Sequence, residues 1–449
     1  MLPVIALVGR PNVGKSTLFN ALTRSRDAIV HDQPGLTRDR LYGRVKRDGA
    51  VRALVVDTGG LGDDSIFAEH IDAQVEMVVA EADEILFLVD HEQGISTRDE
   101  EIAQVLRRSG KPVRIVVNKS EGVDADLAAA EFQQLGHTEV WPVSAKRGDR
   151  VEALLQDILE AYPEPEAETD HESIRVAIVG RPNVGKSTLI NALLGENRVI
   201  VLDQPGTTRD SVSIPFERDG VHYELVDTAG VRRKKTINET VEQFSVVRTI
   251  QAIEKANVCV LMLDGQREPG DQDAAIAGMA HNRGRSLVVL VNKWDNLDEY
   301  HKKQFKNRLE RRFPFLPPHE TLLISALHGT AVGNVLPAVR RAYRSGIIEF
   351  TTSDLNRRLE KAVAAQAPPM HAGHSIKLKF AHQDGTNPPT ITIHGNRLEH
   401  IPKSYTRYLS NFLQKSYKLI GTRVRILYKS DFNPYANRSR GKGGVRGSR

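Results

Sequence analysis

Short apolar runs alternate with amphipathic stretches along the first part of the chain. The runs lie at Ile5–Val8, Leu54–Val56, Ile85–Val89, Arg114–Val117 and Val140–Val143, and polar loop residues follow each one. Runs this short and this continuously apolar predict strands buried on both faces, in a parallel sheet that helices cover on each side. We therefore expect a three-layer α/β fold whose functional loops lie at the carboxyl ends of the strands.

Beyond about residue 350 the pattern changes. Leu355, Leu359 and Val363 recur at a spacing of four and predict a helix over 354–366. The other predicted elements of this part are strands at 375–380, 390–393 and 423–427 and a second helix at 405–414. The order α-β-β-α-β predicts a small α+β module.

Four motifs occur twice, in the same order and at nearly the same spacing. They are GRPNVGKSTL at 9–18 and 180–189, DQPG-x-TRD at 32–39 and 203–210, Asp-Thr-(Gly/Ala)-Gly at 57–60 and 227–230, and Asn-Lys at 118–119 and 292–293. A repeat of this length and order predicts a duplicated domain.

Composition marks the remaining boundaries. Residues 163–173 hold five acids, two prolines and no large apolar side chain, which predicts a solvated linker. Residues 437–449 hold five basic residues, four glycines and no acid, which predicts a flexible tail. We therefore predict a first domain at 1–162, the acidic linker at 163–173, a second domain at 174–349, the α+β module at 350–436 and the basic tail at 437–449.

The overall composition is that of a soluble globular protein, with an apolar fraction of 40% and a charged fraction of 27%. No run approaches the roughly 18 to 20 apolar residues that a membrane span needs. The apolar N-terminus has no basic leader and is interpreted as a buried strand rather than a signal peptide. The single cysteine, Cys259, lies in an apolar run and is expected to be a core residue rather than a catalytic thiol. We expect a cytoplasmic protein.

Charge is distributed unevenly along the chain. The formal net charge is +5, but residues 350–449 hold 18 Lys or Arg against 5 Asp or Glu, a net of +13. A basic C-terminal part on an acidic body predicts contact with an anionic polymer.

The repeated GRPNVGKS satisfies the phosphate-loop pattern G-x-x-x-x-G-K-[ST], after a predicted strand and before a predicted helix. Gly9 and Gly14 let successive backbone amides point at the phosphates. Lys15 is expected to neutralise the β- and γ-phosphates, and the Ser16 hydroxyl to bind Mg²⁺. The second copy repeats this arrangement with Gly180, Gly185, Lys186 and Ser187.

The loops 118–121 and 292–295 are expected to determine whether guanine or adenine nucleotides bind. They resemble the Asn-Lys-x-Asp loop of translation-factor-like GTPases, whose carboxylate accepts hydrogen bonds from guanine N1–H and the exocyclic amine. Glu121 replaces this aspartate in the first copy, so we expect guanine binding there with altered affinity. The segments 144–146 and 325–327 resemble the loop whose backbone supports the base.

Three further positions in each copy match the magnesium and switch elements. Asp57 ends an apolar run and matches the acid that holds Mg²⁺ through its water shell. Thr37 resembles the switch threonine that closes on Mg²⁺ when GTP is bound, and Gly60 can offer its amide to the γ-phosphate. The counterparts in the second copy are Asp227, Thr208 and Gly230.

Two departures from Ras-like enzymes bear on hydrolysis. Leu61 and Val231 stand where those enzymes carry a glutamine that orients the attacking water, which predicts slow intrinsic hydrolysis. Asn12 and Asn183 resemble the asparagine of GTPases activated by a monovalent cation, where it helps to seat K⁺ against the phosphates. The alternative is that these asparagines stabilise the loop turn.

The run Arg232-Arg-Lys-Lys235 follows the second switch segment. A solvated basic face is the ordinary interpretation. The alternative interpretation is that the run contacts RNA or the C-terminal module, depending on which nucleotide is bound.

Tandem GTPase domains, an acidic linker and a basic C-terminal module together resemble the Der (EngA) family of bacterial ribosome-assembly GTPases over essentially the full length. The resemblance implies a KH-like third domain and association with the large (50S) ribosomal subunit and its rRNA. The Gly-x-x-Gly loop of ordinary KH domains is not supplied by 394–397 or 419–422. We therefore expect the third domain to contact the GTPase domains and a structured rRNA surface.

Three functions are open at this point. The first is a GTP-hydrolysing switch on the maturing large subunit, monomeric away from the ribosome, with the second domain as the main hydrolytic site. The second is a GTPase partner in tRNA modification, which predicts a C-terminal catalytic cysteine that this chain lacks. The third is an RNA-binding scaffold with structural nucleotide sites. A membrane-remodelling GTPase is disfavoured, because there is no span and no amphipathic lipid-binding segment.

The predicted cofactors are GTP or GDP, Mg²⁺ and K⁺. The predicted nucleotide-binding residues of the first domain are Gly9, Arg10, Pro11, Asn12, Val13, Gly14, Lys15, Ser16, Thr17, Asp57, Thr58, Gly59, Gly60, Leu61, Asn118, Lys119, Ser120, Glu121, Ser144, Ala145 and Lys146. Those of the second are Gly180, Arg181, Pro182, Asn183, Val184, Gly185, Lys186, Ser187, Thr188, Asp227, Thr228, Ala229, Gly230, Val231, Asn292, Lys293, Trp294, Asp295, Ser325, Ala326 and Leu327. The predicted catalytic residues are Lys15, Thr37, Gly60, Lys186, Thr208 and Gly230, and the predicted Mg²⁺ ligands are Ser16, Thr37, Asp57, Ser187, Thr208 and Asp227.

Overall fold

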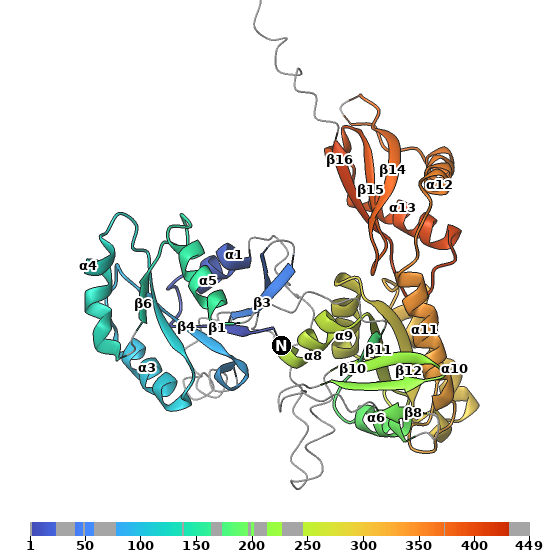
Figure 1. The fold of residues 1–449 in the computed structure, drawn as a ribbon, viewed down its shortest axis with the longest axis horizontal. Helices are drawn as coiled ribbons and strands as arrows, with labels where there is room; N and C mark the ends of the chain where they lie inside the picture. The colour runs from blue at the N-terminus through green and yellow to red at the C-terminus, as the bar shows by residue number, and fades with distance from the viewer. Residues whose placement is uncertain are drawn as a thin grey trace, which may run out of the picture. The chain divides into compact units, whose positions relative to one another are not determined.

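The computed structural model describes residues 2–23, 41–47, 50–57, 78–136, 139–162, 173–195, 199–201, 213–226, 246–371 and 373–430. The chain divides into two compact units (Figure 1). One comprises Met1–Glu172 with Ser245–Gln251, and the other comprises Ser173–Phe244 with Ala252–Arg449. The second unit contains both the second GTPase domain and the α+β module.

The first domain is built on a six-stranded sheet of order β2-β3-β1-β4-β5-β6. Its elements are β1 (Val4–Val8), α1 (Lys15–Thr23), β2 (Leu41–Arg47), β3 (Ala50–Asp57), β4 (Glu84–Asp90), α3 (Thr97–Ser109), β5 (Val113–Asn118), α4 (Ala125–Ala130), a 3-10 turn (Glu131–Leu135), β6 (Glu139–Pro142) and α5 (Val151–Glu160). All neighbouring pairs are parallel except β2 and β3, which are antiparallel. The five strands expected from the apolar runs are confirmed, and β2 is an additional edge strand.

Both faces of this sheet are covered, as the continuous apolar runs predict. Ile5 and Leu7 of β1 pack in one core with residues of α1 and α5. Val4, Ala6 and Val8 pack in the opposite core with residues of α3. Alternate residues of one strand therefore serve two cores, which requires the strand to be apolar throughout.

The second domain repeats this architecture on a seven-stranded sheet of order β13-β12-β11-β7-β10-β9-β8. Its elements are β7 (Ile174–Val179), α6 (Lys186–Leu194), β8 (Val199–Val201), β9 (Ile214–Arg218), β10 (Val221–Val226), α8 (Val246–Lys255), β11 (Val258–Asp264), α9 (Asp271–Asn282), β12 (Ser286–Asn292), a 3-10 turn (Trp294–Asn296), α10 (Glu299–Arg312), β13 (Glu320–Leu323), a 3-10 turn (Val332–Asn334) and α11 (Val335–Gly346). Strands β8 and β9 are antiparallel additions at the edge, and the other pairs are parallel.

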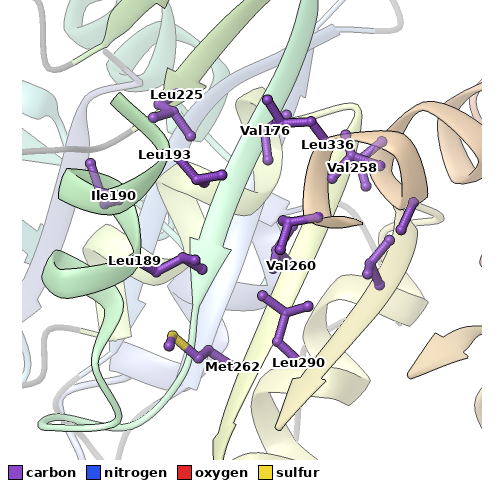
Figure 2. Packing of buried hydrophobic residues seen from close by; sticks show 14 of the residues in the cluster. Val176, Leu189, Ile190, Leu193, Leu225, Val258, Val260, Met262, Leu290 and Leu336 are labelled. Atoms are coloured by element: carbon purple, nitrogen blue, oxygen red, sulfur yellow. The ribbon is translucent and has the colours of Figure 1, made fainter. Parts of the chain in front are cut away.

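Figure 2 shows the core of the second domain, where side chains of α6 and α11 meet those of β7, β10, β11 and β12. Cys259 lies in β11 with no exposed surface, and burial raises the pKa of its thiol to about 12. The expectation of a core cysteine is therefore confirmed.

The α+β module has the expected order α-β-β-α-β. Its elements are α12 (Thr352–Ala365), β14 (Lys377–Gly385), β15 (Thr390–Asn396), a 3-10 turn (Leu398–His400), α13 (Lys403–Ser416) and β16 (Arg425–Ser430). Strand β15 pairs antiparallel with β14 and parallel with β16. Leu359 of α12 and Leu409 of α13 share one core with Ile391 and Ile393 of β15, so both helices pack on the same face of the sheet.

The module is joined to the second GTPase domain by backbone hydrogen bonds. The Leu287 amide donates to the Gly421 carbonyl at 2.7 Å, and the Gly421 amide donates to the Pro318 carbonyl at 2.6 Å. Gly421 has φ +73°, and a Cβ atom there would lie 2.5 Å from the Leu287 carbonyl oxygen, so only glycine fits. Leu287 is near the start of β12, so the joint lies at the end of the sheet opposite to the carboxyl ends of its strands.

No helix among the described residues is long and apolar enough to cross a membrane.

Candidate guanine-nucleotide sites

Each predicted phosphate loop follows the strand at which the sheet order reverses. The loop after β1 leads into α1, and β1 lies between β3 and β4. The loop after β7 leads into α6, and β7 lies between β10 and β11. Open α/β sheets bind ligands at the carboxyl edge of such a switch point, so both loops lie where a nucleotide is expected.

One buried asparagine in the first domain holds three loops together. Asn118 Nδ2 donates to the Val13 carbonyl at 2.8 Å, and Asn118 Oδ1 accepts from the Ala145 amide at 3.0 Å. The asparagine side chain thus connects the phosphate loop with both loops expected around the base. The three motifs, which are far apart in the sequence, form one site.

The second domain repeats this arrangement closely. Asn292 Nδ2 donates to the Val184 carbonyl at 2.8 Å, and Asn292 Oδ1 accepts from the Ala326 amide at 2.9 Å. The same asparagine explains the glycine before each lysine. A Cβ atom on Gly14 would lie 2.2 Å from Asn118 Nδ2, and one on Gly185 would lie 2.3 Å from Asn292 Nδ2.

The phosphate-loop lysines lie over their own loops. Lys15 Nζ donates to the carbonyls of Gly9 at 2.8 Å and Arg10 at 2.7 Å. Lys186 Nζ makes the equivalent bonds in the second domain, at 3.2 Å and 2.8 Å. Burial lowers the pKa of Lys15, and the negative charge of Asp57 opposes this change. The ammonium group is therefore held where a phosphate would neutralise it.

Ser16 and Asp57 fit the expected magnesium site of the first domain. Ser16 Oγ donates to Asp57 Oδ2 at 2.9 Å, and Asp57 is 1% exposed. Mg²⁺ in nucleotide sites takes a few protein oxygens, with water and phosphate oxygens completing its octahedron. Among the described residues there is no group of three or more His, Cys, Asp or Glu that could hold a metal ion.

The acids expected to contact guanine differ between the domains. Glu121 Oε2 is buried and has no hydrogen-bond partner among the described residues. A buried acceptor without a partner is costly, and guanine would supply the two donors that this carboxylate needs. Asp295 Oδ2 lies 3.5 Å from His328 Nε2, an ion pair when the imidazole is protonated. The described part of the first domain shows no such pair at Glu121.

Arg10 and Arg181 belong to the predicted nucleotide set, but their side chains bind acids of the fold. Arg10 Nε donates to Asp99 Oδ2 at 3.1 Å, and Arg181 Nε donates to Asp273 Oδ1 at 2.9 Å. Both acids are fully buried and lie in the first turn of the helix after the third parallel strand. These bonds anchor each phosphate loop to the neighbouring helix.

A second pair of acids supports the lysines of the guanine loops. Lys119 Nζ lies 2.7 Å from Asp90 Oδ2, and Lys293 Nζ lies 2.6 Å from Asp264 Oδ2. Sequence analysis did not identify Asp90 or Asp264. The available signal was an acid at the end of the same apolar strand in both copies, β4 and β11.

The remaining base-loop residues are held by both side-chain and backbone contacts. Ser120 Oγ donates to the Val143 carbonyl at 2.9 Å, and the Ser144 amide donates to the Asp149 carbonyl at 3.1 Å. In the second domain Trp294 packs edge-on against Phe305, and Leu327 is 78% exposed. The Leu327 side chain therefore lies in solvent, and support of the base by the backbone of this loop stays a prediction.

Asn12 and Asn183 adopt the left-handed conformation, with φ of 66° and 61°. Asparagine is favoured there, which supports the turn-stabilising interpretation of these residues. Pro11, Thr17, Pro182 and Thr188 lie in or directly after the same two loops.

Several predicted site residues lie outside the described residues. They are Thr37, Thr58, Gly59, Gly60, Leu61, Thr208, Asp227, Thr228, Ala229, Gly230 and Val231, together with the basic run Arg232–Lys235.

Comparisons with known proteins show which families the domains resemble. A family profile described as a 50S ribosome-binding GTPase matches residues 4–119 and again 175–293. A second profile, described as the KH-domain-like C-terminal domain of EngA bacterial GTPase enzymes, matches residues 350–429. The chain is 52% identical over 441 residues to GTPase Der of Aromatoleum aromaticum, covering 97% of this chain and 99% of that protein. It is 51% identical over 443 residues to GTPase Der of Thioalkalivibrio sulfidiphilus, covering 98% of this chain and 95% of that protein.

Proposed function

Because the chain belongs to the Der (EngA) family of bacterial GTPases, we propose that it acts as a switch in the maturation of the large (50S) ribosomal subunit. The chain is a GTPase with two GTPase domains followed by a KH-like domain. The observation that carries the nucleotide-binding part of the proposal is the buried asparagine that joins the phosphate loop to the expected guanine loops in each domain. Two such sites can hold two nucleotides at once.

The partner in this proposal is the large subunit and its rRNA. The description of the matching family profile names the 50S ribosome, and the last hundred residues carry a net charge of +13. Positive charge of this density favours a polyanion and makes binding depend on salt. In this proposal the protein is cytoplasmic and monomeric away from the ribosome.

The proposed chemistry is GTP hydrolysis with Mg²⁺, stimulated by K⁺. Ser16 and Asp57 would hold the Mg²⁺ ion, which polarises the phosphate oxygens when bound. Lys15 supplies charge to the β- and γ-phosphates, while the amides of the phosphate loop orient them. Asn12 and Asn183 are the proposed K⁺ contacts, at the position where a cation would add charge to the transition state.

The two domains are proposed to contribute unequally, with the second as the main hydrolytic site. The difference rests on Glu121 against Asp295 and on the basic run Arg232–Lys235. Replacing Lys15 and Lys186 separately with Ala tests this division. We expect the two variants to lose GTP turnover unequally, and equal losses would refute the proposed division between the domains.

Sedimentation with ribosomal subunits tests the ribosomal role. The protein is mixed with separated small and large subunits and GTP, GDP or a non-hydrolysable GTP analogue. Comigration with the large subunit that depends on the nucleotide is expected. Equal or absent binding to both subunits in every nucleotide would refute the proposal.

Turnover measured in K⁺ and in Na⁺ tests the cation. Faster hydrolysis in K⁺ is expected, together with loss of the difference in the Asn12→Ala and Asn183→Ala double variant. Hydrolysis in neither salt would favour a scaffold with structural nucleotide sites.

The alternative role in tRNA modification would need a reactive thiol, and the buried Cys259 does not offer one.

A further inference from the structure

Among the described residues, helices pack on only one face of the sheet of the KH-like domain, and we call the other the open face. Helices α12 and α13 cover the packed face, where Ile391 and Ile393 are buried (Figure 1). Phe380 of β14 and Leu427 of β16 are each 45% exposed. Ile426 and Tyr428 pack against the covered core, so the alternate residues of β16 point to the open side.

Three rings lie stacked across two strands of this open face. Phe380 is opposite His394 in the strand register, with ring centroids 4.4 Å apart and planes within 3° of parallel. His382 stacks on His394 at 5.1 Å with an angle of 29°. The three rings therefore form one stacked cluster across β14 and β15, in which the Phe380 ring is 45% exposed and His394 Nε2 is buried.

Cations lie on the adjacent strand. Lys429 is opposite His394 in register, and Arg425 is opposite Thr390. The nearby acid, Asp384, accepts a hydrogen bond from the Thr392 hydroxyl, lies 2.7 Å from His382 Nε2 and is close enough to Lys429 to interact with its charge. Positive charge therefore borders the rings on the β16 side.

We propose that this open face binds single-stranded RNA, with bases stacking on the rings and phosphates contacting Lys429 and Arg425. We define the stacking face as Phe380, His382, His394, Arg425, Leu427 and Lys429. The proposal rests on the RNA partner of the proposed function, and it assigns binding to the sheet rather than to a Gly-x-x-Gly loop. Aromatic side chains accept any base, so recognition is expected to tolerate changes of sequence.

Charge and ring chemistry favour RNA over a protein partner on this face. Leu427 is the only aliphatic side chain of the stacking face, whereas protein interfaces rely on a larger apolar centre. The sequence after β16, residues 431–449, holds five basic residues and one acid, Asp431. A polyanion with flat bases would match both the rings and the basic residues, whereas an apolar protein surface would match neither.

The test uses the full-length chain and fluorescence anisotropy of labelled single-stranded oligouridylate and oligoadenylate. Phe380→Ala is expected to weaken binding of both oligomers by roughly tenfold, as for the loss of one stacked base. Phe380→Tyr keeps the ring and should bind like the wild type. Lys429→Gln should reduce the slope of log affinity against log salt by about 1.

The control is Phe315→Ala, which removes an exposed phenylalanine from the second GTPase domain. It should leave RNA binding unchanged, and all variants should keep wild-type GTP turnover. Wild-type oligomer binding by Phe380→Ala would overturn the proposal. So would a result in which Phe380→Ala alters the compactness of the chain in small-angle scattering but not RNA binding, because the face would then be a protein-docking surface.

The result is separable from the ribosomal role. If the wild type fails to comigrate with the large subunit but Phe380→Ala still loses oligomer affinity, the stacking face stands and the ribosomal proposal falls. If the wild type comigrates and Phe380→Ala binds oligomers normally, only the stacking face falls.

Discussion

Removing the side chain of Asn118 should break the first nucleotide site without unfolding the chain. This asparagine is 4% exposed, and its amide bonds both the Val13 carbonyl and the Ala145 amide. In Asn118→Ala both partners lose their hydrogen bond. The phosphate loop and the loop at Ala145 are then no longer held together.

The magnitude follows from the two groups left without partners. A buried polar group that loses its partner costs roughly 1–3 kcal/mol, so the two together cost about 2–6 kcal/mol at the junction of the loops. Every 1.4 kcal/mol corresponds to about tenfold in affinity. Because bound nucleotide requires the loops to be ordered together, we expect GDP affinity at the first site to fall by at least about thirtyfold.

The assay is a titration of the full chain with a fluorescent GDP analogue. Asn118→Ala should leave one tight site, and Asn292→Ala should leave the other, because Asn292 bonds Val184 and Ala326 in the same way. Asn20→Ala is the matched control, since Asn20 is exposed on α1. Two tight sites in Asn118→Ala, within about threefold of the wild-type affinities, would refute the reasoning.

Three other changes follow from the contacts. Gly14→Ala places a Cβ atom 2.2 Å from Asn118 Nδ2, and Gly185→Ala places one 2.3 Å from Asn292 Nδ2. Each variant should therefore lose nucleotide binding at its own site in the same titration. Binding at both sites in either variant would contradict this prediction. Asp99→Asn removes the charge that anchors Arg10 and should raise the GDP dissociation rate of the first site severalfold in stopped-flow experiments, whereas an unchanged rate would show that the contact does not order the loop. Burial and the charge of Arg423 lower the pKa of His281 to about 4. The free energy of unfolding is therefore highest above pH 6.5, where the imidazole is neutral, and up to about 3 kcal/mol of it is lost as the pH falls from 6.5 to 4. Chemical denaturation at several pH values should show a smaller loss in His281→Gln, and equal pH dependence in both proteins would refute this prediction.

The parallel strands could be predicted from the sequence because burial on two faces requires a continuous apolar run. The antiparallel edge strands could not be found in this way. In β9, Ile214 and Phe216 are buried while Pro215 and Glu217 are partly exposed, so its pattern alternates. Strand β2 contains arginines and a lysine and resembles a loop when only apolar runs are counted.

The candidate sites were predictable where a motif is short and local. The phosphate loops and the guanine loops were found because each lies within a few residues of sequence. The anchors Asp99 and Asp273 were not found, because they lie 89 and 92 residues from the arginines that they bind. Such pairs depend on the packing of a helix beside the loop, which no local spacing encodes.

The number of guanine nucleotides bound by one chain tests the central claim most directly. Equilibrium dialysis with radiolabelled GDP and Mg²⁺ should give two nucleotides per wild-type chain, and one for each of Lys15→Ala and Lys186→Ala. A single nucleotide on the wild type, or two on either variant, would contradict the account of two independent guanine-nucleotide sites.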